Sequence, residues 1–228
     1  NSRIHKWDLK AKKVSVFMEK SGGANGLFFS KEGDLFACQG ESKRVTSFYL
    51  EDGGEKELLA DQFDGRPFNK PNDLWIHPNN GVFFTDPNYG KQDLSQDGEY
   101  LYFITPYRDQ VLRVDEELKR PNGVIGTPDG KTLYVADPGQ GKTFRYVIDE
   151  GEEGGLSWRI DQVEAEGGFG EAQGEPAFAG VRRLLEGIGS RDAPHSDRRC
   201  MHHEVDVLRP VSTLPEGPHP GAGGQGGG

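Results

Sequence analysis

Short apolar and β-branched runs alternate with Gly, Pro, Asn and Asp over most of the first 150 residues. Runs of this length, bounded by turn-forming residues, predict β-strands, and no helical periodicity competes with them. The turns at 77–81 (HPNNG) and 127–130 (TPDG) contain Asn-Gly and Asp-Gly pairs, whose positive φ values suit tight hairpins. The pattern therefore predicts antiparallel sheets from residue 3 to about residue 148.

The predicted strands form a unit that occurs three times. Each unit opens with an Asn and continues through two strands joined by a turn, with the Asn at positions 25, 72 and 122. The spacings, 47 residues from 25 to 72 and 50 from 72 to 122, are close to the roughly 40 to 50 residues of a four-stranded propeller blade. A third-strand pattern at 3–7 has no partner strands before it, so we expect the chain to start in mid-blade.

The composition changes near Glu150. Residues 1–142 contain 13 Lys and 6 Arg, whereas 143–228 contain 0 Lys and 8 Arg, and the chain ends in a Gly-rich run at 221–228. Such a segment buries too little apolar surface to offset its ordering entropy. We therefore divide the chain into a partial β-propeller, 1–150, and a tail of low order, 151–228, with at most an incidental helix at 179–187. The abrupt loss of Lys also suggests a shifted reading frame.

Charge and hydropathy exclude two classes of partner. The net charge is -10 and the sequence contains no basic stripe, so we expect no nucleic-acid binding. No apolar run approaches the roughly 18 to 20 residues of a membrane span, which predicts a soluble protein and leaves the compartment open between cytoplasm and periplasm. Two cysteines, Cys38 and Cys200, are too few for a disulfide framework.

Asn72 and Asn122 are the first candidates for chemistry, because they occupy the same place before the first strands of successive units. First strands line the channel of a propeller, so the two carboxamides should meet at one mouth, where their oxygens suit a hard divalent cation. The alternative is that Pro-Asn-Asp and Pro-Asn-Gly are ordinary turns in which Asn caps its own backbone.

Other polar residues have simpler explanations. Asp86 and Asp137 precede Pro at matching positions, which is typical of a turn into the third strand, while Tyr89 is placed to face the channel mouth. The cluster of His, Cys and Glu at 195–204 fits no zinc spacing.

Three segments carry a family resemblance: 70–74 (KPNDL), 84–90 (FTDPNYG), and 120–123 (RPNG) followed by 128–137 (PDGKTLYVAD). Together they resemble the gluconolactonase, senescence-marker-protein and luciferin-regenerating-enzyme family over about residues 1–150. The resemblance implies an all-β, six-bladed propeller that hydrolyses sugar lactones or related esters with one divalent metal, calcium first and zinc or magnesium as alternatives.

By this resemblance Asn122 is a metal ligand, and Asn72 lies at the metal and contacts substrate or a bound water. Lys70 stands where animal members often have a substrate-contacting Arg, and Tyr89 is a further substrate-binding candidate. The family's Glu ligand would precede Asn1. Its Asp, both ligand and proposed general base, would belong to the first strand of the blade after Asn122. The nearest candidate, 156–161 (LSWRID), does not match that strand, so the catalytic base is unassigned.

The sequence thus predicts about three blades of a propeller and a metal-dependent lactone hydrolase with a small-molecule substrate, impaired by the missing carboxylates. The alternative is a non-catalytic propeller module for binding or interaction. A third possibility, an esterase related to strictosidine synthase or paraoxonase, would share the architecture but not the KPND and RPNG pair.

Overall fold

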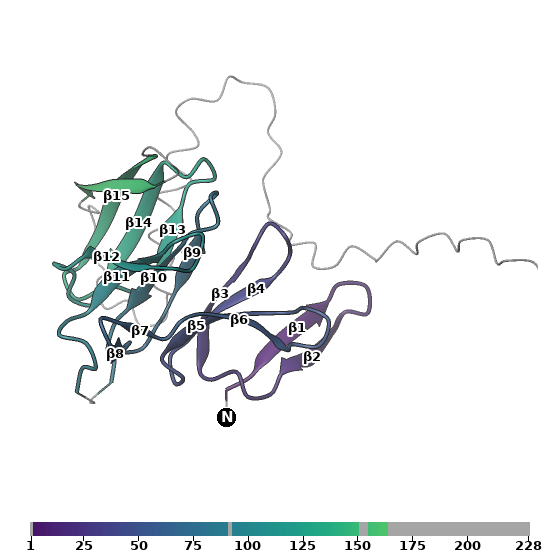
Figure 1. Ribbon diagram of the computed structural model, residues 1–228. Coiled ribbons are helices and arrows are strands. Elements are labelled where there is room, and N and C mark those ends of the chain that lie inside the picture. Colours follow the sequence, from purple (N-terminus) through teal and green to yellow (C-terminus); the bar gives the residue numbers. More distant parts are fainter. Residues whose placement is uncertain (1, 91–92, 151–154, 164–228) are drawn as a thin grey trace, which may run out of the picture. The chain divides into compact units, whose positions relative to one another are not determined.

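The computed structural model describes residues 2–90, 93–150 and 155–163 (Figure 1), all within the first of two compact units, Asn1–Arg191. Every regular element in this part of the chain is a β-strand, and none of it forms a helix able to cross a bilayer. The predicted helix at 179–187, the cluster at 195–204 and the Gly-rich end lie outside the described residues.

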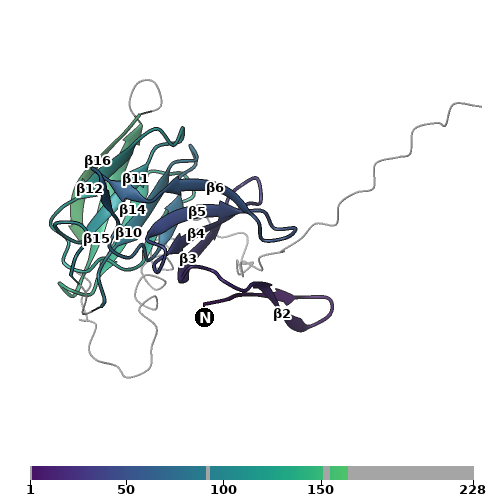
Figure 2. The ribbon, with the colours of Figure 1, turned by 60° about the horizontal axis from the view of Figure 1, so that its bottom comes forward.

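Three four-stranded antiparallel sheets account for the predicted repeats, and we call them blades 1, 2 and 3. Blade 1 comprises β3 (Ala24–Phe29), β4 (Leu35–Gln39), β5 (Arg44–Phe48) and β6 (Glu55–Ala60). Blade 2 comprises β9 (Leu74–Ile76), β10 (Val82–Asp86), β11 (Tyr100–Ile104) and β12 (Val111–Asp115). Blade 3 comprises β13 (Val124–Gly126), β14 (Thr132–Asp137), β15 (Lys142–Glu150) and β16 (Leu156–Val163). Each blade pairs its strands in chain order, as Figure 2 shows for β4, β5 and β6 of blade 1.

Two hairpins complete the described part. The strands β1 (Ile4–Asp8) and β2 (Lys13–Met18) form a two-stranded sheet. The short strands β7 (Gln62–Phe63) and β8 (Arg66–Pro67) connect blade 1 to blade 2. The first strands of the blades are neighbours, since β9 contacts both β3 and β13. The fold is therefore an incomplete β-propeller.

The core has two layers, one on each face of blade 2. Successive side chains of a strand point to opposite faces, so Phe84 and Tyr102 stack in the layer towards blade 1, with ring centroids 5.3 Å apart. Phe83 and Phe103, 4.5 Å apart, pack in the layer towards blade 3. Blade 2 is thus buried on both faces, which fixes its register and holds the three first strands together.

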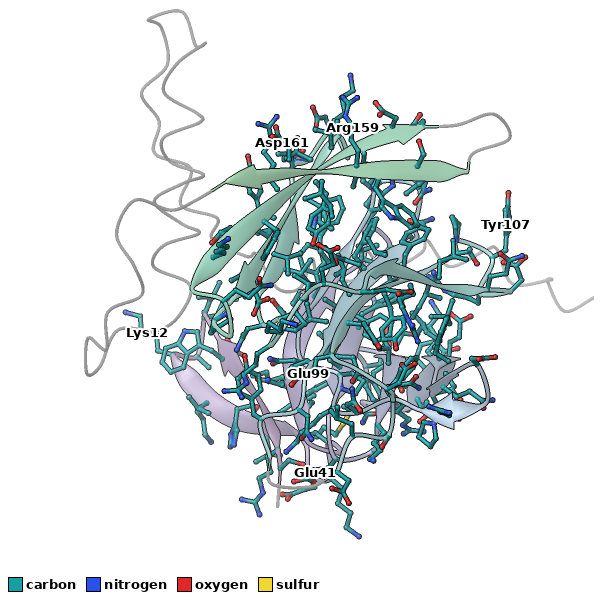
Figure 3. The ribbon with its side chains drawn as sticks, turned by 90° about the vertical axis from the view of Figure 1, so that its left-hand side faces the viewer. Lys12, Glu41, Glu99, Tyr107, Arg159 and Asp161 are labelled. Atoms are coloured by element: carbon teal, nitrogen blue, oxygen red, sulfur yellow. The ribbon has the colours of Figure 1, made fainter. Side chains whose placement is uncertain are left out.

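Blade 3 continues past the expected boundary at residue 150, because β16 adds a fourth strand to it. The alternation of Leu156, Trp158 and Ile160 with polar residues suits a strand with one packed face. The Trp158 ring packs against Phe83 and Phe103, and its Nε1 donates to Val114 O at 3.2 Å. Figure 3 shows the polar neighbours Arg159 and Asp161 on the outer side of this strand. The low average hydropathy of the whole tail concealed this short amphipathic run.

Candidate functional site

Two equivalent segments lead into the first strands of blades 2 and 3, and we call them lead-in segments 69–72 and 119–122. The Asn72 N–H donates to Thr85 O at 2.8 Å, and the Asn122 N–H donates to Ala136 O at 2.8 Å. Each Asn therefore lies beside the end of the second strand of its own blade. The two share a neighbour as well, since the Thr85 hydroxyl donates to Asn122 O at 2.5 Å.

A buried Asp holds each lead-in segment. The Asp86 carboxylate accepts the N–H groups of Asn69 and Lys70 at 2.7 and 2.6 Å. The Asp137 carboxylate accepts those of Lys119 and Arg120 at 2.8 and 2.9 Å. These residues fix the backbone just ahead of each Pro-Asn pair, which is a different role from the turn into the third strand expected for both.

The turn role holds for one of the two. Asp137 also accepts the Gly139 N–H at 2.9 Å and the Gln140 side-chain amide at 2.8 Å, so it caps the turn after β14. The hydrogen bonds that the described residues give to the Asp86 carboxylate come from the lead-in segment alone. Asp86 and Asp137 thus both hold a lead-in segment, and Asp137 also caps a turn.

Burial changes the acidity of two carboxyl groups near the site. Desolvation raises the pKa of Asp86 to about 7, although the N–H groups of Asn69 and Lys70 oppose the shift. Desolvation also raises the pKa of Asp73 to about 6, opposed by the N–H groups of Val124 and Leu74. A carboxyl with so few water contacts holds its proton at a higher pH than an exposed one.

Asn72 is buried, with 7% of its surface exposed, and it is held from the preceding blade. The Asn25 Nδ2 donates to Asn72 Oδ1, and the Gly26 N–H donates to Asn72 O at 2.7 Å. Sequence reasoning left Asn25 out of the site, although its place at the start of the first repeat was a signal that could have included it.

Asn122 is more open, and Tyr89 orients it. The Asn122 Nδ2 donates to the Tyr89 hydroxyl at 2.7 Å, and the Arg120 guanidinium lies over the Tyr89 ring, 5.7 Å from its centroid. Burial raises the pKa of the half-exposed Tyr89, so its hydroxyl remains a donor at neutral pH. No hydrogen bond between described residues uses Asn122 Oδ1, which leaves this oxygen for a ligand.

Lys70 is the outermost candidate. Its backbone N–H is fixed by Asp86, while its side chain is exposed and its stem passes Gly40, where an added Cβ would lie 2.9 Å from Lys70 Cγ. Glu99, labelled in Figure 3, accepts the Asn88 N–H at 2.9 Å through its Oε2 and lies close enough to Asp86 to raise the pKa of that carboxyl.

Asn72 and Asn122 are the metal-ligand candidates that the sequence offers among the described residues. Carboxamide oxygens suit calcium, but calcium takes roughly 6 to 8 oxygen ligands and binds more tightly as carboxylates are added. In the part of the chain that the structure describes, no three His, Cys, Asp or Glu side chains are grouped to hold a metal ion. Asn72 and Asn122 therefore fit the chemistry of such a cation without completing its coordination.

Comparison with known proteins places this arrangement in a family. A family profile described as SMP-30/Gluconolactonase/LRE-like region matches residues 1–168. A curated gluconolactonase from Zymomonas mobilis is 26% identical over 152 residues, which are 59% of this chain and 42% of that protein. The chain thus spans less than half the length of this relative.

Solved structures show the same fold. The gluconolactonase XC5397 from Xanthomonas campestris aligns with a TM-score of 0.60 at 25% identity, over 69% of this chain and 54% of that one. Regucalcin from Agrobacterium tumefaciens, a calcium-binding protein, aligns with a TM-score of 0.53 at 15% identity, over 70% of this chain and 51% of that one, a likeness of fold alone. Because the family profile covers most of its residues, this chain belongs to the SMP-30/gluconolactonase/LRE-like family.

Proposed function

We propose that this chain forms the substrate-orienting part of a site that hydrolyses a sugar lactone or a related ester. The observation that carries the proposal is the Asn122 carboxamide, whose Nδ2 is held by the Tyr89 hydroxyl while its Oδ1 is left for a ligand. A turn-forming Asn would use its side chain on its own backbone. An oriented amide beside a half-exposed tyrosine is instead suited to polar recognition.

The residues of this chain have distinct roles in the proposed site. Asn122 Oδ1 accepts a hydrogen bond from a sugar hydroxyl or binds a cation, and the Tyr89 hydroxyl donates its own proton to a ligand oxygen. Asn72 contacts the substrate from the buried side, and Lys70 offers a cationic donor at the rim. We infer a divalent cation as partner, calcium ahead of zinc and magnesium, with Asn122 and Asn72 as neutral ligands. When bound, such a cation polarises a carbonyl and lowers the pKa of water.

The test is hydrolysis of D-glucono-1,5-lactone, followed with a pH indicator above the spontaneous rate, in calcium and in EDTA. We expect slow, metal-dependent turnover, because general-base help is typically worth about 10² to 10⁴ in rate and none of the described residues is assigned to it. Asn122→Ala should abolish the metal-dependent part. Equal turnover by the wild type and this variant would refute the proposal and favour the turn interpretation.

One observation favours a second candidate, a module that binds its ligand without turnover. The described residues group no three metal-binding acids, histidines or cysteines, and two neutral oxygens alone hold a cation weakly. Calorimetric binding of 1,5-anhydroglucitol, which has the sugar ring but no ester to cleave, distinguishes the candidates. Binding that requires Asn72 and Asn122, together with no lactone turnover, would support the module.

A further inference from the structure

Thr85 connects the ends of two blades through its side chain. It is fully buried at the end of β10, where its hydroxyl donates to Asn122 O at 2.5 Å and accepts the Asp73 N–H at 3.3 Å. The hydrogen bond to Asn122 crosses from blade 2 to the lead-in segment of blade 3. The Thr85 side chain therefore fixes the backbone of Asn122, whose carboxamide is the more open of the two.

Asp73 makes the second connection between the same two blades. Its Oδ2 accepts the Val124 N–H at 3.0 Å, two residues after the carbonyl that Thr85 holds. The backbone on both sides of Gly123 is thus tied to blade 2. Gly26 makes room for this carboxylate from the other side, because a Cβ there would lie 2.6 Å from Asp73 Oδ1 and 2.5 Å from Asp73 Cα.

The blade framework itself does not require these two side chains. In blade 2, Asn72 N–H donates to Thr85 O and Thr85 N–H donates to Asp73 O, at 2.8 and 3.0 Å. Blade 3 repeats both bonds with Ala136 and Gly123 in the corresponding places, at 2.8 and 2.9 Å. The same backbone pattern therefore forms with a methyl group and no side chain at these positions. The hydroxyl and the carboxylate of blade 2 serve the contact with blade 3.

We propose that Thr85 and Asp73 are positioning residues, which together set the place of the Asn122 carboxamide relative to Asn72. The Thr85 hydroxyl binds the carbonyl of Asn122, and the Asp73 carboxylate binds the N–H of Val124. Neither needs to touch the ligand. The consequence for lactone chemistry rests on the proposed function, whereas the positioning of Asn122 is a property of the folded chain and can be tested without turnover.

The experiment compares Thr85→Val, which removes the hydroxyl at nearly constant shape, with Thr85→Ser, which keeps it. In ¹⁵N-labelled full-length chain, the side-chain amide signal of Asn122 is expected to shift in Thr85→Val and to stay in place in Thr85→Ser. The matched control is Thr46→Val in blade 1, which removes another buried hydroxyl, bonded to Gln39 Oε1 at 3.1 Å. This control should leave the Asn122 signal unchanged.

Turnover gives the second measurement. Loss of one hydrogen bond corresponds to a roughly 3- to 10-fold effect, so Thr85→Val should lower kcat/KM for glucono-1,5-lactone by about that factor, with Thr85→Ser close to the wild type. If the Asn122 signal shifts but no variant nor the wild type hydrolyses lactone, the positioning role stands and the lactonase proposal fails. If turnover is present and the signal does not move in Thr85→Val, the positioning role of Thr85 is refuted.

A second pair protects the test against a folding failure at position 85. Asp73→Ala removes the acceptor of the Val124 N–H, whereas Asp73→Asn keeps a carbonyl oxygen there. In Asp73→Ala, hydrogen exchange at the Val124 amide should accelerate at least tenfold, and the Asn122 side-chain signal should shift. In Asp73→Asn, both should change little. An accelerated Val124 amide with an unmoved Asn122 signal would show that the bond serves blade packing alone.

Discussion

The two lead-in segments end in the same Pro-Asn pair and make equivalent backbone hydrogen bonds, yet they present their Asn side chains differently. Segment 69–72 is buried at Asn69 and Asn72, which are 6% and 7% exposed, and its Asn72 oxygen accepts the amide of Asn25. Segment 119–122 is exposed at Lys119 and Arg120, and only the nitrogen of its Asn122 is engaged by Tyr89. Equivalent repeat positions therefore yield one buried carboxamide whose oxygen accepts a protein hydrogen bond and one more open carboxamide that is held through its nitrogen.

This difference arises from neighbours and not from the repeat itself. Blade 1 covers Asn72 with Asn25 and Gly26, whereas the loop after β10 supplies Tyr89 to Asn122. The repeat determines the backbone conformation at each position. Contacts from neighbouring residues determine which side-chain atoms of the Asn are left without a hydrogen bond. Substitutions with equal effects on the two segments would contradict this difference between Asn72 and Asn122. Substitutions that affect only one segment would support it.

The largest effect is expected from the two aspartates that hold the segments. Asp137→Ala leaves four donors without their acceptor, at Lys119, Arg120, Gly139 and Gln140. We expect a loss of about 3 to 4 kcal/mol in the free energy of unfolding, measured by urea denaturation at pH 8.

The matched change Asp86→Ala should cost less, about 2 kcal/mol. It removes two hydrogen bonds. It also removes the desolvation cost of a buried carboxylate, which is the cause of the raised pKa of Asp86. An Asp86→Ala protein less stable than Asp137→Ala would contradict this ranking and show that the enclosed segment depends more strongly on its aspartate.

The second prediction concerns the contribution of Asp86 to the pH dependence of stability. Its pKa of about 7 in the fold exceeds the ordinary value of 3.8, so the folded state binds more protons between these values. The contribution of Asp86 to stability is therefore fully present below about pH 4 and is lost as the pH rises through about 7, with a slope of up to about 1.4 kcal/mol per unit.

Asp86→Asn removes this titration while keeping one acceptor oxygen. The stability difference between wild type and Asp86→Asn should fall as the pH rises from 4.5 to 7 and then level off. Lys43 and Glu99 face Asp86 with opposite effects on its pKa, so their charges partly offset each other. A difference that is constant or increases with pH would refute the assignment.

The third prediction tests the enclosure of Asn72. Gly26→Ala would bring a Cβ to 2.8 Å from Asn72 O and 2.5 Å from Asp73 Cα, and both neighbours are backbone atoms that cannot rotate away. Overpacking of this kind costs typically 1 to 3 kcal/mol, and we expect about 2, measured as a fall in unfolding free energy. Gly33→Ala is the control, because it meets no atom within 4 Å and should cost about 1 kcal/mol through its positive φ. Equal costs would argue against close packing at Gly26.

Sequence reasoning recovered what the repeat determines and missed what depends on contacts between blades. The strands, the hairpins and the matched places of Asn72 and Asn122 follow from local pattern. The contacts of Asn25, Thr85 and Asp73 join residues at least 37 positions apart, and no local pattern reports such pairings. β16 was missed for another reason, because an average over the tail outweighed the short alternation in 156–160.

The smallest effect is expected at Tyr89, and it bears on whether the open carboxamide is functional. Tyr89→Phe removes the acceptor of the Asn122 amide and keeps the ring under Arg120, so it frees the carboxamide to rotate. Loss of one hydrogen bond is worth about 1 kcal/mol, which corresponds to a fall of roughly fivefold in kcat/KM for lactone or in affinity for 1,5-anhydroglucitol. Stability should change little, because Tyr89 is half exposed. Tyr107→Phe is the control, since Tyr107 is 86% exposed and lies outside both lead-in segments in the sequence. If both variants behave like the wild type, Tyr89 does not orient Asn122 for a ligand, and the contrast between the two segments is one of packing alone.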